Sequence, residues 1–141
     1  MKEDNTIYFR EEYAQISFSS SKSYMDVIWK APITDVAHYK LTLSKALVVL
    51  KQYDVKNWIT DISLKSSVTS DEKDWIIKYL LPNVKDTSLE KLAFIVNKDT
   101  FNGEESETFQ KQIEEQGICT KLFHKKDDAY EWIGTLCASA E

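Results

Sequence analysis

Short runs of β-branched and aromatic residues alternate along the chain with longer runs in which apolar residues recur at helical spacing. The clearest short run covers residues 57–62, where tryptophan, isoleucine and threonine leave neither face of a strand wholly polar. A strand with one wet face would instead alternate apolar and polar residues. We therefore expect residues 57–62 to form a central strand of a sheet.

A polar segment and an amphipathic helix follow this strand. Thr69 and Glu72 have the spacing of a capping box, in which a hydroxyl and a carboxylate each bind a free backbone N–H at a helix start. Asp71 adds negative charge where the helix dipole favours it. We expect the helix to begin at Thr69 and to fray at Pro82, which has no backbone N–H.

The spacing of apolar residues also predicts which face of this helix is buried. Asp74 and Lys78 are expected to face water. The residues expected to face the sheet are Trp75, Ile76, Tyr79 and Leu80.

The amino-terminal part of the chain contains three runs of strand character, residues 6–10, 14–19 and 24–30. Short polar or charged turns separate them, so we expect an antiparallel meander that ends before Pro32. Alternate residues of a strand point to one face. The inward-facing residues expected here are Ile16, Phe18, Val27 and Trp29.

The longest helix is expected from an N-cap at Thr34 to Tyr53, because this segment contains no glycine or proline. His38 lies beside Lys40 with no second ligand or catalytic group near it in the sequence, and we interpret it as a solvated histidine. The apolar stripe of the helix consists of Val36, Tyr39, Leu43, Ala46, Leu47 and Leu50.

Two further pairs of strand and helix complete the chain. Residues 91–97 are almost wholly apolar and predict a strand buried on both faces. Asn102 and Glu105 have capping-box spacing, and Gly117 is expected to close that helix, which should be the most exposed one. The last strand and helix are expected over residues 119–124 and 127–136, with Ala129, Trp132, Ile133 and Leu136 facing inward.

The predicted order of elements is β-β-β-α-β-α-β-α-β-α. Alternation of strand and helix after the third strand favours right-handed crossovers and parallel pairing of the last four strands. The first two strands must then pair antiparallel at one side. We expect an α/β fold with a mixed six-stranded sheet flanked by helices, and a single domain over residues 1–141.

Composition limits the classes of function. Hydrophobic residues make up 43% of the chain and charged residues 29%, which is the balance of a globular protein in water. No apolar run approaches the roughly 20 residues that span a bilayer, and no secretion signal follows Met1. The net charge of −5, with acids and bases interspersed, argues against nucleic-acid binding. We expect a cytoplasmic protein with no membrane span and no nucleic-acid partner.

Candidate reactive groups are few. With three glycines the chain has no loop that cradles phosphate, and we expect no cofactor. His124 lies near Asp127 and Asp128, but such groups on one loop are more often solvated than metal ligands, so no metal site is expected. Cys119 and Cys137 match no metal or redox spacing, and we interpret both as buried thiols.

Asp61 is the one acid whose position suits a site. It lies at the carboxyl end of the predicted central strand, where open α/β sheets bind ligands. No nucleophile, general base or oxyanion donor converges with Asp61 in any readable spacing. We therefore expect no catalytic residues and no enzymatic activity.

A series of aromatic and apolar motifs recurs along the chain in a characteristic order. They are Trp29, Trp58-Ile59-Thr60-Asp61, Asp74-Trp75, Ala93-Phe94-Ile95-Val96, Leu122-Phe123 and Asp128-Ala129-Tyr130-Glu131-Trp132-Ile133. With these motifs the chain resembles the STAS-like families of the SpoIIAA-like fold, in an uncharacterised bacterial branch. The resemblance covers nearly the whole chain, but most of its residues are packing residues, so it supports the fold far more than an activity.

The resemblance implies a binding function for the segment before the second helix. STAS domains that oppose anti-sigma factors bind proteins, and phosphorylation of a serine at the start of the helix after a central strand switches them. Here that place is residues 66–70. The glycine typical of those regulators is missing, and a phosphate would face the nearby carboxylates of Asp71, Glu72 and Asp74. Helix capping by Thr69 and Ser70 is therefore favoured over a phosphoswitch.

We expect a non-enzymatic protein-interaction or regulatory domain that uses the segment before the second helix. The candidate binding residues are Asp61, Ser66, Ser67, Thr69 and Ser70. The alternative is a small carrier that binds an apolar or lipid-like ligand in an aromatic pocket, drawing on six Phe, seven Tyr and four Trp. Core filling explains these rings more simply. The sequence leaves a homodimer open.

Overall fold

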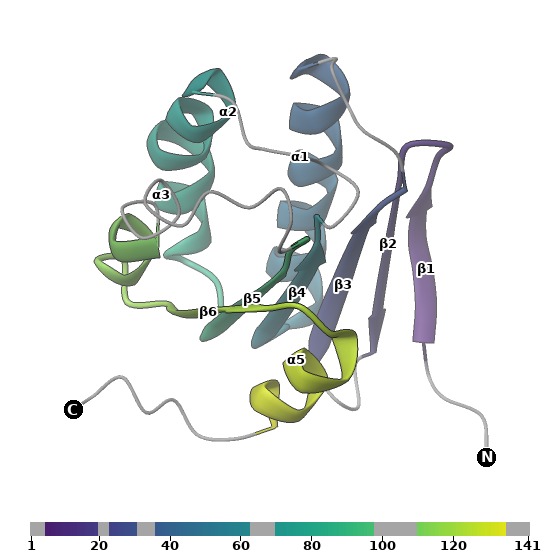
Figure 1. Cartoon of the computed structure of the whole chain (residues 1–141). Helices are drawn as coiled ribbons and strands as arrows, with labels where there is room; N and C mark the ends of the chain where they lie inside the picture. Colours follow the sequence, from purple (N-terminus) through teal and green to yellow (C-terminus); the bar gives the residue numbers. More distant parts are fainter. Residues whose placement is uncertain (1–4, 20–22, 31–35, 63–69, 98–109, 135–141) are drawn as a thin grey trace.

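The computed structural model describes residues 5–19, 23–30, 36–62, 70–97 and 110–134. Its strands and helices follow the predicted order (Figure 1). The elements are β1 (Asn5–Arg10), β2 (Ala14–Ser19), β3 (Tyr24–Trp29), α1 (Val36–Tyr53), β4 (Asn57–Asp61), α2 (Ser70–Trp75), η1 (Ile76–Leu80), α3 (Leu81–Val84), β5 (Lys91–Ile95), β6 (Cys119–Phe123) and α5 (Lys126–Ile133). Residues 110–114 are also helical.

The six strands form one mixed sheet in the order β1-β2-β3-β4-β5-β6. The pairs β1/β2 and β2/β3 are antiparallel, whereas β3/β4, β4/β5 and β5/β6 are parallel. The predicted α/β class, the mixed six-stranded sheet and the central place of β4 are therefore confirmed.

Helices cover both faces of the sheet (Figure 1). Helix α1 packs against β2 and β3, whereas α5 packs against β4, β5 and β6. Trp58 belongs to the large apolar core on the side of α1, and its neighbour Ile59 belongs to a small apolar cluster on the side of α5. We call these two sides the α1 side and the α5 side.

The inward faces predicted for the first strands and for α1 are confirmed. Ile16, Phe18, Val27 and Trp29 are all buried on the α1 side. The predicted stripe of α1 is buried as well from Tyr39 to Leu50. Among the other predicted inward residues, the side chain of Val36 and residue Leu136 lie outside the described part of the chain.

The helix after β4 differs from its prediction, because it does not fray at Pro82. Residues Ile76–Leu80 form a π-helical turn, in which the Leu81 N–H donates to the carbonyl of Ile76, five residues earlier. Pro82 then takes one of the first positions of α3, where its fixed φ suits a helix and its missing N–H costs little.

The extra residue in this turn rotates the helix and changes its buried face. Ile76, Leu80, Leu81 and Val84 are buried, whereas Tyr79 is 46% exposed. The predicted inward position of Tyr79 is therefore wrong. The prediction failed because it continued a spacing of 3.6 residues per turn through a π turn.

The state of Cys119 also differs from its prediction. Cys119 is disulfide-bonded in the structure and is not a free thiol. Sequence spacing does not show which cysteines a fold brings within bonding distance. Cys137 lies outside the described residues.

Several predicted helix caps fall on residues that the structure does not describe, namely Thr34, Thr69, Asn102 and Glu105. The predicted role of Gly117 is confirmed. Its φ is +88°, and its N–H donates to the carbonyl oxygen of Glu114 at 2.9 Å, which closes the helix of residues 110–114. Within the described ranges, no helix is both long enough and apolar enough to cross a membrane.

Candidate functional site

The carboxyl ends of β3, β4, β5 and β6 lie at one edge of the sheet, because these four strands are parallel. Ligands of open α/β sheets bind at this edge. Two of the predicted binding residues are described here: Asp61 is the last residue of β4 and Ser70 is the first residue of α2. Ser66, Ser67 and Thr69 lie outside the described residues.

The structure does not bring Asp61 and Ser70 to one face of the sheet. Asp61 alternates with Thr60 along β4 and shares the α5 side with Ile59. Its charge contributes to raising the pKa of both Asp26 and Tyr130, which lie on that side. Ser70 begins α2, whose continuation packs into the core of the α1 side. The two described residues of the predicted set therefore lie on different sides of the sheet, and the prediction for the set as a whole stays untested.

Glu72 lies between helices. The sequence predicts it as a capping-box carboxylate, and the structure shows it only 1% exposed. Burial first, and then the nearby charge of Glu72, raise the pKa of Tyr39 on α1. Glu72 therefore lies close to Tyr39, in the interface of α2 with α1.

An aromatic pair lies on the outer face of the helix that follows β4. The rings of Trp75 and Tyr79 stack with their centroids 5.1 Å apart and their planes 29° apart. Trp75 is half-buried and packs against the core, whereas Tyr79 is exposed. Asp71 and Asp74 are exposed on the turns that precede this pair.

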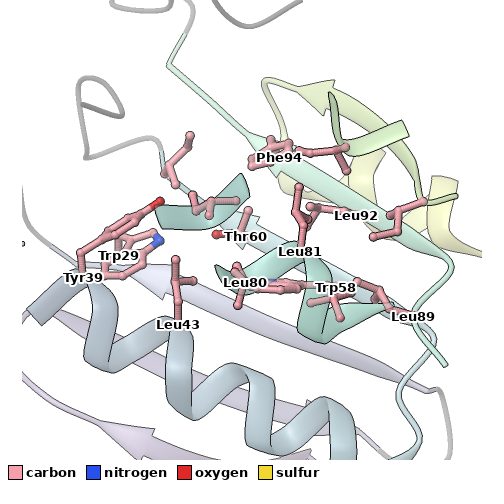
Figure 2. A pocket seen from close by; sticks show the side chains of 15 residues that line it. Trp29, Tyr39, Leu43, Trp58, Thr60, Leu80, Leu81, Leu89, Leu92 and Phe94 are labelled. Atoms are coloured by element: carbon pink, nitrogen blue, oxygen red, sulfur yellow. The ribbon is translucent and has the colours of Figure 1, made fainter. Parts of the chain in front are cut away.

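An apolar cavity of about 40 Å³ lies on the α1 side, between the sheet and the helices α1, η1 and α3. Figure 2 shows that rings from β3, α1, β4 and β5 contribute to its walls. The labelled lining residues include Trp29, Tyr39, Trp58, Leu80, Leu81 and Phe94. Pockets that hold drug-sized ligands measure roughly 300–1,000 Å³. A lipid-like ligand does not fit this cavity without displacement of its walls.

A polar cluster on the α5 side was not predicted from the sequence. Asp26 of β3 is 5% exposed, and one of its carboxyl oxygens accepts a hydrogen bond from the hydroxyl of Tyr130 on α5. The other oxygen, Oδ1, is buried without a hydrogen-bond partner. The signal in the sequence is an acid inside the otherwise apolar run of residues 24–29.

Burial and neighbouring groups act in opposite directions on this cluster. Burial is the largest effect and raises the pKa of Asp26. The hydrogen bond from Tyr130 and the charge of Lys126 lower the pKa of Asp26, whereas the charge of Asp61 raises it. Burial and the hydrogen bond to Asp26 raise the pKa of Tyr130.

Both histidines are exposed, as expected for solvated side chains. His38 is exposed, and its ring stacks on Tyr13 with centroids 4.3 Å apart. His124 is exposed, and its Nδ1 lies 3.4 Å from the carbonyl oxygen of Val96. Among the residues that the structure describes, no three His, Cys, Asp or Glu side chains are grouped to hold a metal ion.

No model of a known protein family matches the chain, and no curated protein matches it. Among solved structures, the chain is similar to the crystal structure of an uncharacterized protein from the DUF3478 family, with a SpoIIAA-like fold, from Shewanella loihica. The two chains are 17% identical over 94% of this chain and 95% of that one, with a TM-score of 0.48. The fold named for that protein agrees with the resemblance in the sequence, and so weak a likeness carries no argument about activity, ligand or partner.

Proposed function

We propose that the chain is a non-enzymatic protein-binding domain whose contact surface is the outer face of α2 and η1 together with residues 63–69. The observation that carries the proposal is the stacked pair of Trp75 and Tyr79 on that face. We call this pair with the exposed acids Asp71 and Asp74 the α2 surface. The proposed contact includes Ser66, Ser67 and Thr69, which lie within residues 63–69, and Ser70 follows them directly.

The aromatic pair has the properties of a binding anchor. Trp and Tyr are enriched among the residues that dominate protein–protein affinity, because they bury large area at little cost in side-chain entropy. Trp75 packs against the core, and its ring stacks on that of Tyr79. A partner therefore meets a preformed aromatic face, which lowers the entropic cost of binding.

The charges around the pair define the chemistry of the partner. Asp71 and Asp74 are exposed, and the whole chain carries a net charge of −5. An arginine or lysine side chain of a partner can stack on the aromatic face and pair with one of these carboxylates. The proposed partner is therefore a protein segment with basic residues next to apolar ones.

The carrier alternative receives less support from the same structure. Its pocket would be the cavity on the α1 side, which measures about 40 Å³ and is much smaller than sites for lipid-sized ligands. Most of the large rings fill the core instead, as Trp29 and Trp58 do.

Affinity capture with matched variants tests the proposal. A partner captured by the wild-type chain should be lost with Tyr79→Ala, since truncating a central aromatic anchor costs about 2 kcal/mol or more, roughly thirtyfold in Kd. Asp71→Asn with Asp74→Asn should weaken capture and reduce its dependence on salt.

The control is Leu41→Ala, which removes an apolar side chain of similar exposure on a different helix, α1. Capture should survive this change. Equal capture by wild type and Tyr79→Ala would refute the proposed surface. A small molecule retained in a native mass spectrum, without any protein partner, would favour the carrier alternative.

A further inference from the structure

Helix α5 is held on the sheet by little apolar surface. Ala129 is its one fully buried residue within the described span, and Tyr130, Trp132 and Ile133 are half-buried. The apolar cluster beneath it contains Ile59, Ala93 and Ile95. Polar tethers add to this attachment, and two of them involve an ionisable side chain of a strand.

The first tether joins Tyr130 to Asp26. The hydroxyl of Tyr130 donates to Oδ2 of Asp26, and Oδ1 of the same carboxyl group is buried without a partner. If Asp26 is ionised, a buried carboxylate is left with a single hydrogen bond, which costs far more than burying the neutral acid. If Asp26 is protonated, its carbonyl oxygen still accepts the hydrogen bond from Tyr130.

The second tether joins Lys91 to the end of α5. Nζ of Lys91 lies 3.3 Å from the carbonyl oxygen of Trp132 and 3.4 Å from that of Ile133. These carbonyls lie at the negative end of the helix dipole, where an ammonium group is favourable. Burial lowers the pKa of Lys91, and the charge of Glu90 opposes this shift.

We propose that α5 is a pH-sensitive latch, in which a proton on Asp26 holds the helix on the sheet and loss of that proton to solvent releases it. Release hydrates the carboxylate of Asp26 and frees the phenol of Tyr130. It also uncovers the apolar cluster of Ile59, Ala93 and Ile95. The α5 side then becomes an accessible surface at higher pH.

The groups that face Asp26 set the direction of the response. Helix α5 contributes Tyr130 and Lys126, and β4 contributes Asp61. Tyr24, on the same strand as Asp26, contacts the ring of Tyr130 edge-on. Ser17, opposite Asp26 on β2, carries no charge. Burial and Asp61 outweigh Tyr130 and Lys126, so the pKa of Asp26 is higher with α5 docked than with α5 released.

The higher pKa of Asp26 in the docked state determines how docking of α5 depends on pH. A carboxyl group with a raised pKa in the docked state stabilises docking fully below its ordinary pKa, and this stabilisation is lost as pH rises through the raised pKa. The lowered pKa of Lys91 acts the other way, because it strengthens docking as pH rises towards the ordinary pKa of a lysine. Just above the ordinary pKa of an aspartic acid, Asp26 sets the direction.

Hydrogen-exchange protection of the α5 amides, measured by NMR on the full chain, tests the latch. Protection factors remove the intrinsic pH dependence of exchange, so a change reports docking. Between about pH 4 and about pH 8, protection of residues 126–133 in the wild type should fall severalfold, because docking loses the stabilisation from protonated Asp26 as pH rises through its raised pKa. Protection in α1 should stay constant.

Two variants separate the latch from general destabilisation. Asp26→Asn keeps the shape but does not titrate, so its α5 protection should not change over this pH range. Asp61→Asn removes a charge that raises the pKa of Asp26, so the transition should move to lower pH. Constant protection in the wild type, the same fall in Asp26→Asn, or an unmoved midpoint in Asp61→Asn would each overturn the proposal.

Discussion

The ammonium nitrogen of Lys91 lies 3.3 Å from the backbone carbonyl oxygen of Trp132, 41 residues later, and 5.4 Å from the centre of its indole ring. Lys91 is only 3% exposed, although it opens a strand that is otherwise apolar. Its partners are carbonyl oxygens and an aromatic face rather than a carboxylate. The lysine therefore contributes both a packed hydrocarbon stem and a cap for the end of α5.

Replacing Lys91 separates these two contributions. Lys91→Ala should lower the free energy of unfolding by about 2–3 kcal/mol, because it removes the packed stem and the donor together. Lys91→Met should cost about 1 kcal/mol, since a chain of similar length still fills the space and no charge is buried. Urea unfolding measures both values, and equal losses would show that the stem contributes nothing.

Strand alternation was sufficient to predict which residues of the first strands fill the main core. Ile16, Phe18, Val27 and Trp29 face the α1 side because each strand sends every second residue to one face. The same rule places Asp26 on the other face but does not indicate its burial. The cover comes from Tyr130, 104 residues later, and no local pattern connects two such distant residues.

Helical spacing predicted only part of the buried face of the helix after β4. Ile76 and Leu80 are buried as expected, but the π turn displaces Tyr79 to the surface and brings in Leu81 and Val84. Hydrophobic periodicity cannot show a π turn, because one extra residue looks like an ordinary irregularity in the pattern. The contact role of Ser66, Ser67 and Thr69 stays a prediction.

Trp58 and Tyr79 should differ sharply in their contributions to stability. Trp58 is 3% exposed in the main core, so Trp58→Ala should lower the free energy of unfolding by about 3–5 kcal/mol. Tyr79 is exposed, so Tyr79→Ala should cost about 1 kcal/mol or less. Urea unfolding of both variants checks this order. A larger loss at Tyr79 would mean that its ring is buried, as helical spacing alone predicts.

Asn83 supports the backbone next to the π turn. Its Nδ2 donates to the carbonyl oxygen of Tyr79 at 2.8 Å. Asn83→Ala should therefore cost about 0.5–1.5 kcal/mol, the usual net value of one hydrogen bond. Lys85→Ala, at an exposed position just beyond α3, serves as the control and should change stability by less than about 0.5 kcal/mol. Thermal unfolding of the two variants measures the difference, and similar losses would contradict a specific role for Asn83.

Two glycines that end helices provide a matched test of backbone conformation. Gly117 has a φ of +88°, whereas Gly134, at the C-cap of α5, has a φ of −82°. An added Cβ at Gly117 meets no atom within 4 Å, and one at Gly134 meets only the carbonyl oxygen of Glu131 at an ordinary 3.5 Å. Steric clash is therefore excluded at both positions, and the difference between them is the sign of φ.

Gly117→Ala should lower the free energy of unfolding by about 1–2 kcal/mol, because a side chain disfavours a positive φ. Gly134→Ala should be neutral or stabilising by up to about 1 kcal/mol, since alanine reduces the entropy of the unfolded chain without strain in the folded one. Gly117→Asn should recover part of the loss, because asparagine tolerates left-handed conformations better than alanine. Urea unfolding of the three variants measures these changes in the free energy of unfolding. If Gly117→Ala were as stable as Gly134→Ala, the helix of residues 110–114 would not end in a left-handed residue.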